Sequence, residues 1–161
     1  DVHRCAEFLN IAFRWPSPDP VKQYQDEQGR RRTAEDQIYI YRLTRLGIVA
    51  AEAGRGIEFA DEGSSLIWGG TRNWQAGDLL AEATNRAGLD LATMDAIVDA
   101  ETLRLESVIL ANQDAHAQSG HWGVPTCAFE GEPFFGQDRI DVLQWRLQQK
   151  GLQLRAAGTA P

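Results

Sequence analysis

Val124 and Pro125 begin a short apolar run whose main chain could hold a ligand. Pro125 has no N–H to offer a sheet, so it belongs at the first residue or at the edge of a strand. If the peptide bond before Pro125 is cis, the Val124 backbone faces a ligand in extended form, and its N–H and C=O can pair with a short peptide as an added strand. The alternative interpretation is a plain strand start after a turn at Gly123.

A second segment whose residue types could bind a ligand comprises Gly136, Gln137, Asp138 and Arg139. Gly136 permits a sharp turn from a strand into a helix. The free N–H groups and positive dipole of that helix end suit a carboxylate, Asp138 can hold an ammonium group, and Arg139 can pair with a carboxylate. Together these groups would hold the zwitterionic end of an amino acid. The alternative is that Asp138 caps the helix and Arg139 faces solvent.

The cysteines and histidines give weaker signals. Cys5 and Cys127 do not form a C-x-x-C pair, and each is expected to be a small buried apolar residue. His116 is expected at the surface or as a cap. His121 either faces the site or, as we favour, lies near a helix end where the dipole stabilises it. The three histidines lack the spacing of metal ligands, so no metal site is predicted.

Two further clusters can be interpreted either as structural features or as ligand-binding features. The three arginines at residues 30–32 indicate a solvated loop, with an anion-binding patch as the alternative. Trp68 and Trp74 indicate core packing, with the lining of an apolar substrate cleft as the alternative.

The elements that must position these residues are mostly helical. Apolar periodicity and glycine stops predict helices over residues 2–9, 34–53, 58–68, 78–87, 91–99, 101–118 and about 137–150. A short extended run is expected at 11–15, and two strands at 123–129 and 133–136 form a hairpin. Prolines at every second position from Pro16 to Pro20 start a stiff connector that continues as a polar loop to residue 33.

Composition restricts the class of protein. The chain has 161 residues, of which 43% are hydrophobic, and a formal net charge of −7. A general nucleic-acid binder would carry a basic stripe, so nucleic acid is not an expected partner. The longest apolar run is too short to span a membrane, and the acidic start does not have the pattern of a signal peptide. With only two cysteines, a reducing cytoplasmic location is the default expectation.

The run from His121 to Thr126 and the run from Gly131 to Asp141 together resemble the C-terminal half of a thioredoxin-like fold. More narrowly, they resemble the group of 2-hydroxychromene-2-carboxylate isomerases, kappa-class glutathione transferases and DsbA-like proteins, which insert an all-helical domain before this hairpin. The resemblance covers residues 1–152 and is sharpest at 120–147. It implies an α/β thioredoxin-like fold with an all-α insertion, mostly helical as given. The implied parts are a thioredoxin-like part (1–15 and 120–152), a linker (16–33), the helical insertion (34–119) and a tail (153–161).

The resemblance also implies a ligand. Glutathione would lie along Val124 and Pro125, with the Val124 main chain pairing with its cysteinyl part. The γ-glutamyl end would lie at Gly136, Gln137 and Asp138, where Asp138 meets the ammonium group. Gln137 stands where relatives often have Ser or Asn. A small organic molecule would be the second substrate, and relatives often form homodimers.

The sequence departs from this group in two respects. The group's β-α-β unit leads into a Ser or Cys that activates a thiol, and no position of this chain matches that nucleophile. An Asn that the isomerases place near the start of the insertion, to touch substrate, is also missing around Pro18, which weakens the case for a chromene substrate. Three functions stay open: a glutathione-dependent isomerase or transferase, a DsbA-like thiol–disulfide oxidoreductase, and a non-catalytic binding module. We expect that these 161 residues by themselves do not turn over glutathione.

Overall fold

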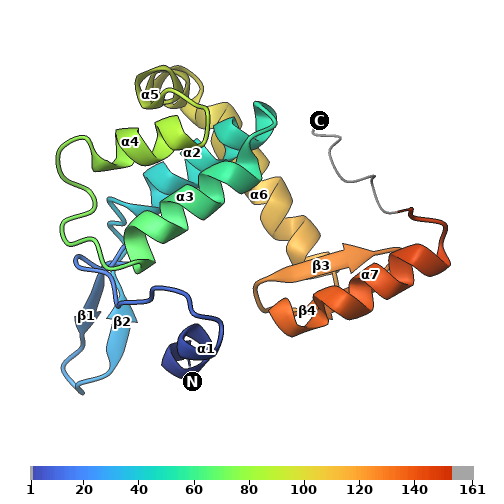
Figure 1. Ribbon diagram of the computed structural model, residues 1–161. Coiled ribbons are helices and arrows are strands. Elements are labelled where there is room, and N and C mark those ends of the chain that lie inside the picture. The colour runs from blue at the N-terminus through green and yellow to red at the C-terminus, as the bar shows by residue number, and fades with distance from the viewer. Residues whose placement is uncertain (1, 154–161) are drawn as a thin grey trace. The chain divides into compact units, whose positions relative to one another are not determined.

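The computed structural model of the protein describes residues 2–153 (Figure 1). The chain divides into two compact units, Asp1–Ile109 and Leu110–Pro161. The first unit is built from helices and one small hairpin, whereas the second contains another hairpin followed by a helix.

Helices α2 (Ile40–Glu52), α3 (Gly56–Trp68), α4 (Leu79–Arg86) and α5 (Leu91–Ala100) pack against one another in the first unit. The first turns of α6 (Thr102–Gln118) complete this bundle. Asp90 caps the N-terminus of α5, because its Oδ1 accepts a hydrogen bond from the Thr93 N–H at 2.8 Å. Ion pairs also tie the helices together: the Arg104 guanidinium donates to both carboxylate oxygens of Glu52 at 2.7 and 3.0 Å, which lowers the Glu52 pKa.

The apolar faces of these helices form one core. It includes Trp74, whose predicted core role is thereby confirmed, while Trp68 is partly buried and packs against the core. The buried apolar residues are Leu46, Val49, Ala50, Phe59, Leu66, Ile67, Trp74, Leu80, Ala83, Ala87, Met94, Val98 and Leu105. All of these lie in the first unit, which therefore has its own hydrophobic core.

The predicted helix start at residue 34 is wrong, since α2 begins at Ile40. The buried side chain of Gln37 holds the preceding segment in a turn. Its Oε1 accepts a hydrogen bond from the Lys22 N–H at 3.0 Å, and its Nε2 donates to the carbonyls of Lys22 and Ala34 at 2.9 and 2.6 Å. An amide that serves three main-chain groups replaces the first helical turn.

Helix α1 (Val2–Phe8) forms as predicted, and Asn10, two residues after its end, adopts the left-handed conformation with φ 52°. The expectation that Cys5 is buried is wrong. None of the α1 residues is buried, and Cys5 is exposed.

Residues 11–33 also differ from expectation. Residues 11–15 form no strand; instead, the Arg14 N–H donates to the Trp68 carbonyl at 2.7 Å. Within the segment predicted to be a polar loop, β1 (Gln23–Gln25) pairs antiparallel with β2 (Arg31–Thr33). The Asp26 carboxylate organises the turn between them by accepting hydrogen bonds from two main-chain N–H groups and from the side chains of Arg30 and Arg32.

In the second unit, strands β3 (Thr126–Phe129) and β4 (Glu132–Phe135) form the predicted hairpin. Glu130 and Gly131 have φ values of 49° and 81°, which is the conformation of a two-residue hairpin turn. A single 3₁₀ turn, η1 (Gln137–Arg139), then leads into α7 (Ile140–Gln149), which packs against β4. The predicted tail begins at Gln153, and its residues 154–161 lie outside the described range.

The predominance of helix agrees with the predicted fold class, and the C-terminal hairpin and helix lie where the sequence indicated. Within residues 2–153, no helix has the length and apolar character that crossing a membrane requires.

The core predicts the effect of shortening a side chain in α6. Leu105 is fully buried, whereas Leu103 of the same helix is 85% exposed. We expect Leu105→Ala to lower the free energy of unfolding by about 2–5 kcal/mol because it leaves a cavity. Leu103→Ala, the matched control, should change it by less than about 0.5 kcal/mol. Urea unfolding measures both, and equal losses would contradict the placement of Leu105 in the core.

Candidate functional site

The two segments predicted to bind a ligand lie beside each other. The Gly136 N–H donates a hydrogen bond to the Pro125 carbonyl at 2.9 Å, directly beyond the Thr126–Phe135 pair of the hairpin. The peptide bond between Val124 and Pro125 is cis. The five residues that the resemblance implies as glutathione contacts, from Val124 to Asp138, therefore lie within one unit of the chain.

Val124 is open to a ligand. The residue is highly exposed, with a relative solvent-accessible surface of 78%. Neither its N–H nor its C=O has a hydrogen-bond partner among residues 2–153, since the hairpin ladder begins at Thr126. A main-chain donor and acceptor at the start of a strand can pair with an extended peptide.

Gly136 makes the turn on the other side of this site. Its φ of 93° and ψ of 153° belong to a region that only glycine adopts readily. A Cβ added to Gly136 would lie 2.5 Å from the Asp138 Oδ1, so the carboxylate of Asp138 lies directly beside the Gly136 main chain. The turn thus places a negative charge next to the hydrogen-bonded Gly136–Pro125 pair.

The Asp138 carboxylate is accessible. Its side chain is 73% exposed, and the nearest cationic partner is Arg139, with 3.9 Å between Nη1 and Oδ2. Among the described residues, no main-chain N–H donates to this carboxylate, so Asp138 does not cap the helix as the alternative interpretation supposed. Gln137 is exposed beside it. Asp138 and Arg139 also line an open hollow of about 580 Å³ along β4 and α7.

The histidines have contacts that the sequence did not indicate. His116 is partly buried, and its Nε2 lies 2.9 Å from the Gly123 carbonyl oxygen, whereas a surface or capping position was predicted. His121 follows α6 and stacks on Phe135, with 4.0 Å between ring centroids. Neither contact has a signature in the sequence spacing, because one joins a side chain to the main chain of a loop and the other joins rings that are 14 residues apart. Cys127 is partly buried opposite Phe134 in the hairpin.

A different hollow, of about 600 Å³, lies in the first unit between residues 13–17 and 70–72. The Arg14 and Arg72 side chains line it, and within residues 2–153 neither has a carboxylate at ion-pair distance. The rings of Phe13, Trp15 and Trp68 form a cluster with centroid separations of 5.4–6.2 Å. The hollow therefore combines aromatic surface with two available positive charges.

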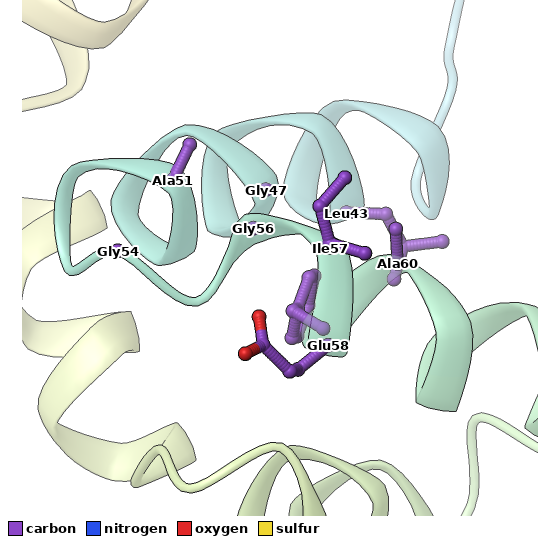
Figure 2. Close-up of a pocket in the computed structure, with 9 residues that line it drawn as sticks. Leu43, Gly47, Ala51, Gly54, Gly56, Ile57, Glu58 and Ala60 are labelled. Carbon is purple, nitrogen blue, oxygen red and sulfur yellow. The ribbon is translucent and has the colours of Figure 1, made fainter. Parts of the chain in front are cut away.

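The hollow shown in Figure 2 offers less chemistry. It lies along α2 and α3, has a volume of about 650 Å³ and is lined mainly by apolar and glycine residues, with Glu58 as the one charged side chain labelled there. The Glu58 carboxylate accepts a hydrogen bond from Arg55 at 3.1 Å. This groove thus presents no reactive group without a partner.

The arginines at residues 30–32 are exposed as the solvated-loop interpretation expected, but Arg31 and Arg32 lie in strand β2 rather than in a loop. Arg30 and Arg32 both pair with Asp26 at 2.9 Å, which offsets their charge.

The sequence profile of the DSBA-like thioredoxin domain family matches residues 1–148. The chain therefore belongs to the DSBA-like thioredoxin domain family. This family includes oxidoreductases and isomerases, so thiol-based chemistry is consistent with the fold. Comparison with curated proteins and with solved structures gives no significant match.

The conformation of Gly136 yields a prediction about stability. Gly136→Ala should lower the free energy of unfolding by about 1–3 kcal/mol, because the added methyl group forces an unfavourable φ and meets the Asp138 carboxylate. Gly63→Ala in α3 is the control, since its added Cβ meets open space, and it should be neutral or stabilising. Thermal or urea unfolding distinguishes the two variants. A Gly136→Ala protein as stable as the control would show that this turn is not held as described.

Proposed function

We propose that the protein binds glutathione as the cosubstrate of an isomerase or transferase reaction in which the glutathione thiolate acts on a small organic molecule. Turnover requires, in addition, the thiol-activating Ser or Cys that no position of these 161 residues matches. The observation that carries this proposal is the hydrogen bond between Gly136 and Pro125. It joins an unpaired strand start to an exposed carboxylate within one small unit, which is the combination that a γ-linked peptide requires.

Each part of glutathione has a partner in this arrangement. The N–H and C=O of Val124 pair with the main chain of the cysteinyl residue, as in strand addition. The Asp138 carboxylate meets the γ-glutamyl ammonium group. The γ-glutamyl carboxylate lies against the N–H groups at Gln137 and Asp138, because the first N–H groups of a helix have no partners within it.

The proposed chemistry is reversible addition. The glutathione thiolate forms a C–S bond to an electrophilic carbon of an unsaturated substrate, a bond in the adduct rotates or opens, and the C–S bond breaks to return the thiolate. In a transfer reaction, the C–S bond is kept and a proton or leaving group completes the exchange. A free thiol has a pKa of about 8.5, so the thiolate needs stabilisation near neutral pH.

The hollow with Arg14 and Arg72 supports an anionic aromatic substrate. Guanidinium groups bind a carboxylate through paired N–H donors, and the neighbouring Phe13 and Trp15 rings can stack on an aromatic ring. The hollow is also fixed by main-chain contacts, since Ser17 and Arg72 form a β-bridge and the Asn73 N–H donates to the Ser17 carbonyl at 2.7 Å. These contacts hold both sides of the hollow in place.

Replacing the Asp138 carboxylate tests the glutathione contact. Asp138→Asn should weaken binding of S-methylglutathione roughly tenfold, because a charge-assisted hydrogen bond to the ammonium group is lost. Isothermal titration calorimetry measures the affinity. Asp141→Asn is the matched control, since Asp141 is an exposed carboxylate in the first turn of α7. Equal affinity for the two variants would refute the assignment of Asp138.

The arginine hollow is tested with 1-naphthoate and its uncharged analogue 1-naphthalenemethanol. In the unchanged protein, naphthoate should quench the fluorescence of Trp15 and Trp68 and bind roughly tenfold more tightly than the alcohol. Arg72→Gln should abolish that preference. Arg55→Gln, which removes an arginine from a surface ion pair with Glu58, should keep it. If the two probes bind equally to the unchanged protein, the hollow does not select anions.

A further inference from the structure

Gly123 is the one buried residue within residues 110–153, and side chains satisfy both of its main-chain polar groups. Its N–H donates to the His121 Nδ1 at 2.9 Å. Its carbonyl oxygen accepts from the Thr126 hydroxyl at 2.5 Å and lies 2.9 Å from the His116 Nε2. Three side chains thus fix one glycine immediately before the unpaired Val124.

Because the peptide bond is planar, the orientation of the Gly123 carbonyl also sets the orientation of the Val124 N–H. The Gly123 carbonyl and the Val124 N–H belong to the same peptide unit, and in a trans peptide they point in opposite directions. This bond is not among the cis peptides of the described residues. When His116 and Thr126 hold the carbonyl on one side, the Val124 N–H must therefore point to the other side, where it has no partner.

We infer that His116, His121 and Thr126 are positioning residues that aim the Val124 N–H at a bound peptide, and that this requires an unprotonated Nδ1 on His121. The inference rests on the proposed function, since it concerns the same glutathione contact. None of the three side chains needs to touch the ligand, because each acts through the Gly123 main chain.

The two histidines have different protonation requirements. A carbonyl oxygen only accepts, so the His116 Nε2 must carry a proton, which holds for one neutral tautomer and for the cation. The His121 Nδ1 accepts a hydrogen bond from the Gly123 N–H, so it must itself be unprotonated. Histidine side chains commonly change charge at roughly pH 5–8. Protonation of the His121 Nδ1 therefore removes its hydrogen bond with the Gly123 N–H, whereas protonation of His116 leaves a donor on Nε2 for the Gly123 carbonyl.

The surroundings of His121 are aromatic rather than charged. Its ring lies parallel to Phe135 of β4, with an interplanar angle of 17°, and to Trp122 at 5.7 Å. In residues 2–153, no carboxylate, lysine or arginine makes a hydrogen bond or ion pair with either histidine. On β4, the strand that carries Phe135, the Glu132 carboxylate is paired with Arg146 at 2.9 Å. His116 from α6 is the other titratable group on Gly123.

The Phe135 ring also explains why residue 123 is a glycine. A Cβ at this position would collide with ring carbons of Phe135. The glycine lets the ring lie over the main chain, and the same ring stacks on His121, so packing and hydrogen bonding hold the imidazole in one orientation.

The test uses two substitutions of His121. His121→Asn keeps an acceptor, because Oδ1 can replace Nδ1, and it does not titrate. His121→Phe keeps a ring for stacking and removes the acceptor. The ligand is S-methylglutathione, which has no thiol to ionise, and its affinity is measured by calorimetry from pH 8 to pH 5. The main-chain N–H signals of Gly123 and Val124 are followed by NMR over the same range.

We expect the affinity of the unchanged protein to fall about tenfold on acidification, the scale of one lost hydrogen bond. His121→Asn should bind equally at both pH values, and His121→Phe should bind about tenfold more weakly even at pH 8. His116→Gln retains a donor and should restore most of the affinity that His116→Phe loses. In the NMR spectra, the Gly123 N–H should follow the titration of His121 and lose that dependence in His121→Asn.

The outcomes separate the inference from the proposed function. Two results would overturn the positioning role and leave glutathione binding in place, provided that the unchanged protein binds S-methylglutathione. One is equal affinity of His121→Phe, and the other is a Gly123 N–H signal that does not change with the protonation of His121. If the unchanged protein fails to bind S-methylglutathione at pH 8 while the Gly123 N–H signal changes with the protonation of His121, the proposed function is overturned. The role of the Val124 N–H as a glutathione contact is then overturned as well.

Discussion

The hydrogen bond from the Gly136 N–H to the Pro125 carbonyl is the contact on which the candidate site depends. It continues the pairing of β3 and β4 one step past Thr126 and Phe135, at the end where both strands leave the hairpin. Gly136 can make this bond and still turn into η1 because it adopts a φ of 93°. One short contact therefore fixes the distance between the open main chain of Val124 and the Asp138 carboxylate.

The two units of the chain are stabilised in different ways. The helical unit buries a continuous apolar core, which resists small polar changes at its surface. In the hairpin unit, Gly123 is the one buried residue of the range 110–153, and order there comes from the strand ladder and from side chains that bond to the main chain. Such contacts depend on the direction of each donor and acceptor, so the order of the hairpin unit depends on a few individual hydrogen bonds rather than on a continuous apolar core.

Sequence patterns predicted the features that depend on local chemistry. Helical periodicity located α2 to α7 to within a few residues, except at the start of α2, and the Phe-Gly-x-Asp turn was correctly placed between a strand and a helix. The errors arose where a single side chain overrides the pattern. Gln37 replaces a helical turn, and Asp26 closes a hairpin whose strands are too polar to show an apolar alternation. The contacts of His116 and His121 with Gly123 have no spacing signature at all.

The proposed glutathione contacts use the main chain of Val124, and this limits what they can select. A main-chain donor and acceptor recognise an extended peptide regardless of its side chains, so they specify the cosubstrate and not the organic substrate. Selection of the organic substrate must then come from side chains of fixed charge and shape. In the first unit, Arg14 and Arg72 line a hollow and have no carboxylate partner in the described part of the chain, which suits that hollow to an anionic ligand. In a chain of net charge −7, leaving two such charges available favours an anionic ligand over internal ion pairing.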